Sequence, residues 1–211
     1  MHWIIPGTAV SYLIGSIPTA YIFGRLLKGI DIRKFGSGNV GATNALRILG
    51  KRAGIVVLSL DVLKGLLPVV LLGNFILQRT LFNPQVILII LGIACITGHN
   101  WPIFLNFKGG KGIATSLGVL LGLAIKIPGL GAILGMVLLI WLVVFLLSRI
   151  VSLASLAGAF FLPVFMLLFK QSILMFSATL ILSIFVILRH KTNIIRLYHG
   201  QETRLKFKKT I

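Results

Sequence analysis

Acidic residues are scarce in this chain of 211 residues, which has only Asp31, Asp61 and Glu202 against 21 lysines and arginines. Glycoside hydrolysis needs two carboxylates that flank one bond, and a two-metal or magnesium–diphosphate site needs several oxygen ligands. The sequence therefore argues against both kinds of chemistry.

Cysteine is also nearly absent. Cys95 is the only one, so there is no disulfide framework and no CxxC pair, and its apolar surroundings indicate a packing residue. The four histidines show neither an HExxH motif nor the Cys/His spacing of a zinc site. We expect no metal site and no cofactor.

Long apolar runs, by contrast, fill most of the sequence, which is 57% hydrophobic with a mean hydropathy of +1.05. A bilayer is crossed by about 20 apolar helical residues. Blocks near this length fall at residues 3–27, 53–78, 85–105, 113–126, 128–148, 150–169 and 171–188. We therefore predict an all-α integral membrane protein with seven transmembrane helices in one domain, residues 1–211. The fourth block is short, which leaves six spans as the alternative, and the first block lacks a cleavage-site pattern, so we expect it to be retained.

The distribution of charge predicts the orientation. With the N-terminus outside, the inner segments carry 17 of the 21 lysines and arginines, and the outer turns carry only Arg79, Lys126 and Lys170. This is the positive-inside pattern, and it predicts a cytoplasmic C-terminus and cations that face anionic lipid. Because the charges are spread over short loops, we expect no nucleic-acid binding.

Two opposite charges lie within the second block. Asp61 and Lys64 are three residues apart, so they share one helix face. We favour a mutual ion pair that faces the bundle interior over a catalytic role.

The first of three donor-rich segments is GSGNVGATNALR, residues 36–47, inside the inner segment 28–52. Its GxGxxG pattern occurs in Rossmann folds, but there it follows a strand, whereas here both neighbours are transmembrane blocks. Glycines also let backbone N–H groups approach an anion at the start of a helix. The candidate ligands are Ser37, Gly38, Asn39, Thr43, Asn44 and Arg47. A tight turn with an Asn cap explains this stretch, taken alone, equally well.

The second segment, residues 98–116, contains FKGGKGIAT. It is again glycine-rich and cationic and again opens a helix, although Lys111 precedes Gly112 rather than the Ser or Thr of a Walker A loop. The candidate ligands are Lys108, Gly109, Gly110, Lys111, Gly112 and Thr115.

The third segment, residues 189–202, follows the last block. Arg189, Asn193 and Arg196 are spaced to share one helix face. A juxtamembrane basic segment that binds lipid headgroups is the alternative, which we accept only for residues 204–209. We expect Glu202 to be a structural partner of the surrounding cations.

All three segments fall on the inner side and contain almost no carboxylate. That combination describes a phosphate-binding site at the cytoplasmic surface of the membrane, beside an apolar groove of the bundle. It suits one small phosphorylated molecule and one long acyl chain.

Five motifs resemble those of the bacterial acyl-phosphate:glycerol-3-phosphate acyltransferases. They are GSIP with Tyr21 (15–21), DIRKFGSGNVGATN with Arg47 (31–47), GHNWPIFLNFKGGKGIAT (98–115), VSLAS (151–155) and RHKTNIIRLYHGQE (189–202). The resemblance implies an inner-membrane enzyme with seven helices and a cytoplasmic active site. It implies transfer of a fatty acyl group from acyl phosphate to the sn-1 hydroxyl of glycerol 3-phosphate, which yields lysophosphatidic acid and phosphate as the first step of phospholipid synthesis. It also implies functional coupling to the enzyme that makes acyl phosphate.

The same resemblance implies roles at the matched positions. Catalytic roles fall to Ser37, Arg47, Lys111 and His190. Substrate binding falls to Lys108, Gly109, Gly110, Gly112, Ser152 and Asn193, and a structural role near the site to Glu202. From the residue types we add as substrate-binding candidates Gly38, Asn39, Thr43, Asn44, Thr115 and Arg196. We also expect a structural role near the site for Asp61 and His99.

An HxxxxD dyad, which another family of membrane acyltransferases uses, does not occur after any of the four histidines. An acyl phosphate is already activated, so juxtaposing two anions and stabilising the developing charge can suffice. Either His190 or a substrate phosphate is the candidate proton acceptor. An acyl-enzyme at Ser37 is less well supported, since no base is paired with it in the sequence.

Two other classes of function compete with this interpretation. A transporter or flippase for a phosphorylated anion would suit the Asp61–Lys64 pair, but the donor segments lie on one face and no inverted repeat is found. A lipid-binding structural protein, with no turnover, is the other.

Overall fold

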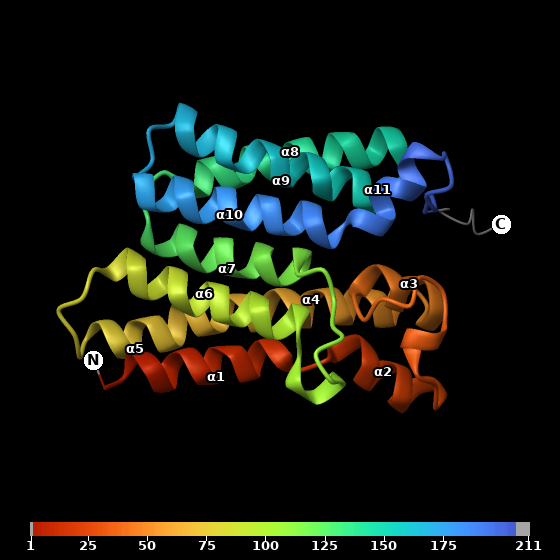
Figure 1. Ribbon diagram of the computed structural model, residues 1–211, viewed down its shortest axis with the longest axis horizontal. Helices are drawn as coiled ribbons and strands as arrows, with labels where there is room; N and C mark the ends of the chain where they lie inside the picture. The colour runs from red at the N-terminus through yellow and green to blue at the C-terminus, as the bar shows by residue number, and fades with distance from the viewer. Residues whose placement is uncertain (1, 206–211) are drawn as a thin grey trace. The chain divides into compact units, whose positions relative to one another are not determined.

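The computed structural model describes residues 2–205, which form helices and connecting loops with no strand among them (Figure 1). The predicted all-helical class is therefore confirmed. The chain divides into two compact units, Met1–Pro128 and Gly129–Ile211. That the whole chain is a single domain stays a prediction.

The first predicted helix of unit 1 is interrupted. It consists of α1 (Ile4–Ser16) and α2 (Thr19–Lys28), which together form a candidate span of 25 residues. Pro18 lies at the break, where it supplies no backbone N–H and cannot continue the hydrogen-bond ladder. At the break the Ile17 carbonyl accepts a 3.1 Å hydrogen bond from the Thr19 N–H.

The rest of unit 1 follows the predicted blocks closely. After η1 (Ile32–Lys34) and α3 (Ala42–Leu49), a 27-residue span is built from α4 (Lys51–Leu67), the π-helical turn η2 (Pro68–Leu72) and α5 (Gly73–Leu77). Then come α6 (Pro84–Asn100), η3 (Ile103–Leu105) and α7 (Ile113–Lys126).

Small residues bring the helices of unit 1 close together. Along α1 and α6, which lie side by side in Figure 1, Gly15 packs on the carbonyl of Cys95 and Gly98 on that of Tyr12. Between α4 and α7, Gly65 packs on the carbonyl of Thr115. Close approach at small residues is how membrane helices gain packing without a hydrophobic driving force. These contacts hold the C-terminal part of α6 against α1 and the start of α7 against α4.

Unit 2 contains α8 (Leu130–Ser148), α9 (Val151–Leu168), α10 (Ile173–Arg189) and α11 (Lys191–Tyr198). α9 packs against both α8 and α10, and the Trp141 indole donates a 3.3 Å hydrogen bond from α8 to the Ser155 hydroxyl on α9. α11 turns away from α10 by 60°.

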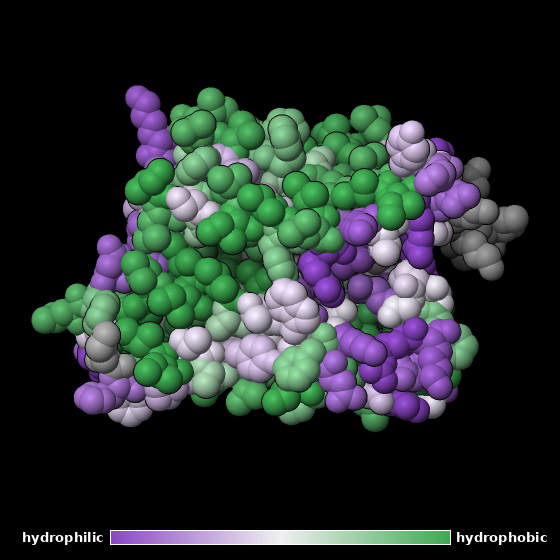
Figure 2. Space-filling view, in the orientation of Figure 1, coloured by the Kyte–Doolittle hydropathy of each residue, from purple (hydrophilic) through white to green (hydrophobic). Residues whose placement is uncertain are grey.

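Five helical segments within the described residues are long and apolar enough to cross a bilayer, and the bent pair α10–α11 raises the number to six. α7, the short fourth block, has 14 residues and is not among them. Figure 2 shows hydrophobic side chains over the bodies of α8, α9 and α10, as expected of helices that face lipid. Seven spans and their orientation stay predictions.

Candidate active site

The first glycine-rich loop, residues 36–44, is organised by one side chain. Asn44 is 1% exposed, and its Oδ1 accepts a 3.0 Å hydrogen bond from the Ser37 N–H. Its amide nitrogen lies 3.0–3.3 Å from the carbonyls of Ile32, Phe35 and Asn39. Gly36 and Gly38 have φ of +60° and +73°, a region where only glycine is unstrained. The structure thus gives Asn44 a role in shaping the loop, and its predicted contact with substrate stays a prediction.

The other candidate ligands of this loop surround Asn44. Ser37, Asn39, Thr43 and Arg47 are half-buried. Thr43 and Arg47 are four residues apart on α3, so they share one face of that helix. Within the described part of unit 1, no base is hydrogen-bonded to the Ser37 hydroxyl, which gives no support to an acyl-enzyme at that residue.

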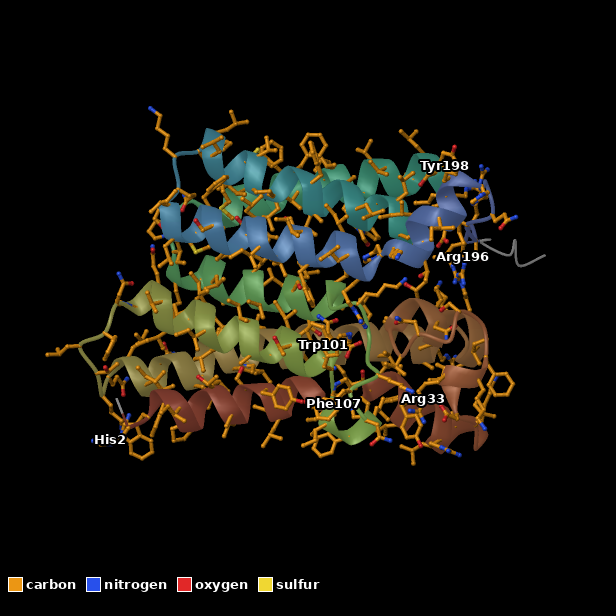
Figure 3. All side chains as sticks on the ribbon, viewed as in Figure 1. His2, Arg33, Trp101, Phe107, Arg196 and Tyr198 are labelled. Atoms are coloured by element: carbon orange, nitrogen blue, oxygen red, sulfur yellow. The ribbon has the colours of Figure 1, made fainter. Side chains whose placement is uncertain are left out.

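A charged cluster that the sequence did not single out lies directly before this loop. Asp31 caps η1 by accepting the Arg33 N–H, and its carboxylate pairs with the Arg33 guanidinium at 2.7 Å. The Arg33 hydrogen bond is the main reason that the pKa of Asp31 falls to about 2. The guanidinium groups of Arg33 and Arg25 both lie over the Tyr21 ring, 5.2 and 5.3 Å from its centroid. Through Arg33, which is labelled in Figure 3, the cluster ties the segment that leads into the loop to Tyr21 on α2.

The second glycine-rich loop folds back onto the C-terminal end of α6. The Gly110 N–H donates to the His99 carbonyl at 3.0 Å and the Gly109 N–H to the Asn100 carbonyl at 3.2 Å. A Cβ on Gly109 would collide with the His99 carbonyl, and one on Gly110 with the His99 ring. Only glycine therefore fits at either position.

This loop ends where α7 begins. Gly112, with φ of +81°, precedes the first turn of α7 and provides no side-chain cap. An uncapped helix start presents N–H groups and the positive end of the helix dipole. Lys111 is half-buried and Lys108 is exposed. The fully buried Thr115 hydroxyl finds no hydrogen-bond partner among the described residues. These features can hold an anion, as predicted from the sequence.

Two exposed aromatic residues precede the same loop in the sequence. Trp101 and Phe107 are exposed and lie in the connection between α6 and α7 (Figure 3). The Trp101 carbonyl accepts a 2.8 Å hydrogen bond from the Tyr12 hydroxyl. This contact links the connection to α1.

In unit 2, His190 occupies the bend between α10 and α11 and is 3% exposed. Its Nδ1 lies 2.8 Å from the Val186 carbonyl. Because a carbonyl only accepts, Nδ1 must carry the hydrogen, and in a neutral ring Nε2 then holds the lone pair that a general base uses.

Glu202 joins three parts of unit 2. Its Oε1 accepts hydrogen bonds from the Ser152 hydroxyl at 2.9 Å and from the Asn193 amide at 2.8 Å. These partners are neutral donors, whereas the sequence led us to expect cations. Its other oxygen, Oε2, is buried without a hydrogen bond in the described residues. Glu202 therefore fixes the start of α9 against α11.

The predicted common face of Arg189, Asn193 and Arg196 is wrong. Arg189 ends α10, and the 60° bend at His190 changes the helix direction before Asn193. Within α11, Asn193 is buried, whereas Arg196, which is labelled in Figure 3, is exposed. The prediction assumed one continuous helix over residues 189–196, and no glycine or proline in the sequence marks the bend.

The comparisons with known proteins agree with this chemistry. A family model described as glycerol-3-phosphate acyltransferase matches residues 5–200. A glycerol-3-phosphate acyltransferase of Fusobacterium nucleatum is 44% identical over 198 residues, covering 94% of this chain and 96% of the relative. One of Prochlorococcus marinus (strain MIT 9211) is 44% identical over 200 residues, covering 93% and 91%.

Two solved structures are also similar. Both are of PlsY (YgiH), described as an integral membrane glycerol 3-phosphate acyltransferase. The glycerol 3-phosphate form has a TM-score of 0.85 at 35% identity, covering 96% of each chain. The lysophosphatidic acid form has a TM-score of 0.81 at 34% identity, covering 96% of this chain and 95% of the other. With its multi-pass helical fold and two glycine-rich loops, this chain belongs to the glycerol-3-phosphate acyltransferase family of integral membrane enzymes.

Proposed function

We propose that the protein transfers a fatty acyl group from acyl phosphate to the sn-1 hydroxyl of glycerol 3-phosphate, and releases lysophosphatidic acid and inorganic phosphate. The observation that carries the proposal is the pair of glycine-rich loops in unit 1, each of which leads into a helix. Arg47 lies in the last turn of the helix that follows the first loop, and Lys111 lies directly before the helix that follows the second. The related PlsY has been solved in a glycerol 3-phosphate form and a lysophosphatidic acid form, which are the acceptor and the product of this reaction.

The chemistry needs binding more than it needs a strong nucleophile. Both substrates carry phosphate, so the first task is to hold two anions close together. Arg47 offers a planar fork for phosphate oxygens, and Lys111 with the backbone N–H groups near Gly112 offers a compact positive site. The acyl carbonyl gains negative charge as the hydroxyl attacks, and the same groups stabilise that charge. The phosphate of the donor leaves without needing an acyl-enzyme.

His190 is our candidate for the base that removes the proton of the sn-1 hydroxyl. The bond from Nδ1 to the Val186 carbonyl fixes the ring and its tautomer. If a substrate phosphate takes the proton instead, His190→Gln should keep near-normal turnover. Loss of about 100-fold or more in kcat, with the KM for glycerol 3-phosphate little changed, would support His190.

We further propose seven membrane-crossing segments in a single domain, with the N-terminus outside, the active site open to the cytoplasm, and a place in the bacterial inner membrane. The support is the excess of lysine and arginine on one side, 17 against three. The enzyme that makes acyl phosphate is the expected functional partner, because a reactive, poorly soluble donor benefits from short transfer.

Sealed vesicles that contain the purified protein test the function against its main alternative. Labelled glycerol 3-phosphate is added with and without palmitoyl phosphate. Formation of labelled lysophosphatidic acid only with palmitoyl phosphate supports the proposal. Uptake of unchanged glycerol 3-phosphate, without product, would favour a transporter and contradict it.

A further inference from the structure

We propose that Asp61 and His99 are positioning residues that hold the second glycine-rich loop, Gly109–Gly112, in its binding geometry. Asp61 acts through His99, and neither is expected to touch the reacting atoms. The inference rests on the proposed function for its kinetic consequence, but its structural part concerns the loop alone.

The Asp61 carboxylate is the centre of a buried polar group inside the second span. Its Oδ1 accepts a 2.6 Å hydrogen bond from the Thr19 hydroxyl on α2 and pairs with the Lys64 ammonium at 2.7 Å. The predicted Asp61–Lys64 ion pair is therefore present, and both side chains are at least nine-tenths buried.

Lys64 also reaches the interruption between α1 and α2. Its ammonium donates a 2.8 Å hydrogen bond to the Ile17 carbonyl, which also accepts a 3.1 Å hydrogen bond from the Thr19 N–H at the break. The ion pair is thus anchored on two helices besides its own, and Asp61 cannot shift without breaking these bonds.

His99 connects this anchored carboxylate to the loop. The His99 Nδ1 lies 3.7 Å from Asp61 Oδ1, which is too long for a hydrogen bond but close enough for electrostatic attraction when the ring is protonated. The opposite edge of the same ring, at Nε2, lies against Gly110, where a Cβ would collide with it. The His99 ring is therefore a spacer between Asp61 and the backbone of the loop.

Stability alone gives little reason for such an arrangement. A buried ion pair is often no better for stability than apolar residues of the same volume, and an ionisable group within a transmembrane segment usually has a functional reason. The loop itself has no side chain at Gly109, Gly110 or Gly112 that could hold it in position. Asp61 and Lys64, acting through the His99 ring against Gly110, provide that support.

The test uses hydrogen exchange and steady-state kinetics on the full-length protein in detergent. The variants are His99→Asn, which removes the ring edge under Gly110, and Asp61→Asn, which removes the charge. Cys95→Ala is the matched control: Cys95 lies in α6, the helix of His99, and donates to the Lys64 carbonyl, so this variant alters a buried side chain next to Lys64 while the His99 ring and the Asp61 charge stay in place. Thr19→Val is a milder variant that weakens the anchoring of Asp61 without leaving Lys64 unpaired, in case Asp61→Asn does not fold.

We expect faster exchange of the amides in residues 107–112 in His99→Asn and Asp61→Asn, with α4 and the rest of α6 unchanged. The KM for glycerol 3-phosphate should rise about tenfold, with kcat and the KM for acyl phosphate within about twofold. A smaller shift in the same direction is expected for Thr19→Val, and none for Cys95→Ala.

The inference is overturned if the amides of the loop exchange at the wild-type rate in every folded variant. It is also overturned if kcat falls while the KM for glycerol 3-phosphate is unchanged, because that result indicates a smaller folded fraction. If the wild-type protein makes no product at all, the proposed function fails, but the exchange measurements still decide whether Asp61 and His99 position the loop.

Discussion

The loop at residues 36–44 is held by hydrogen bonds to one buried side chain, whereas the loop at residues 109–112 is hydrogen-bonded through its backbone to the end of α6 and packs on the His99 ring. In the first, the Asn44 amide bonds to groups on both sides of the turn. In the second, Gly109 and Gly110 bond and pack directly on the end of α6. Similar compositions therefore produce two different supports, and the two loops should fail in different ways when they are altered.

The largest effect is expected at the backbone-supported loop. Gly109→Ala would place a methyl group against the carbonyls of His99 and Asn100, so the loop must move away from α6. We expect acyl transfer to fall by about 100-fold or more. Gly131→Ala in α8 is the control, because nothing lies within 4 Å of its Cβ position; it should retain wild-type activity. Near-normal activity of Gly109→Ala would contradict the account of this loop.

A smaller but still clear effect is expected at Asn44. Asn44→Ala leaves the Ser37 N–H and several loop carbonyls without their partner, and each buried unsatisfied group costs about 1–3 kcal/mol. We expect a lower Tm in detergent together with an activity loss of about tenfold or more. Asn74→Ala, in α5, removes an amide with none of these contacts and serves as the control. Equal Tm values for the two variants would show that Asn44 does not support the loop.

The smallest effect concerns the Asp31–Arg33 pair that precedes the first loop. The pKa of Asp31 is lowered from 3.8 to about 2, so folding favours the charged carboxylate. Its stabilisation is complete above pH 3.8 and is lost as the pH falls toward 2. Because Arg33 is a third exposed, we expect Asp31→Asn to cost only about 1 kcal/mol near neutral pH. Thermal unfolding of both proteins across this range should show the Tm gap closing as the solution is acidified; a constant gap would mean that the charge is not responsible.

Hydropathy predicted the helices to within a few residues because each span must be apolar over the width of a bilayer. Hydropathy alone does not predict the interruption at Ile17–Pro18, although Pro18 marks it in the sequence. The contact of Lys64 with the Ile17 carbonyl could not be predicted, because that carbonyl belongs to another part of the chain. The bend at His190 was missed because no proline or glycine marks it.

The sequence predicted which residues belong to the candidate site, but it did not predict which of them shape a loop and which are available to bind substrate. A glycine-rich loop that leads into a helix, with a lysine or arginine nearby in the sequence, indicates an anion site from local sequence alone. By contrast, the partners of Asn44 and Glu202 lie up to 12 and 50 residues away. Those contacts depend on how the chain folds, so a donor that shapes a loop looks the same in the sequence as one that binds substrate.

The most direct test of the central claim is the stoichiometry of acyl transfer with the wild-type protein. Labelled glycerol 3-phosphate is supplied with palmitoyl phosphate, palmitoyl-CoA or palmitoyl-acyl carrier protein, and lysophosphatidic acid and inorganic phosphate are measured together. We predict product only with palmitoyl phosphate and one phosphate released for each lysophosphatidic acid formed. Product from either thioester, or phosphate released without product, would contradict the assignment of acyl phosphate as the donor.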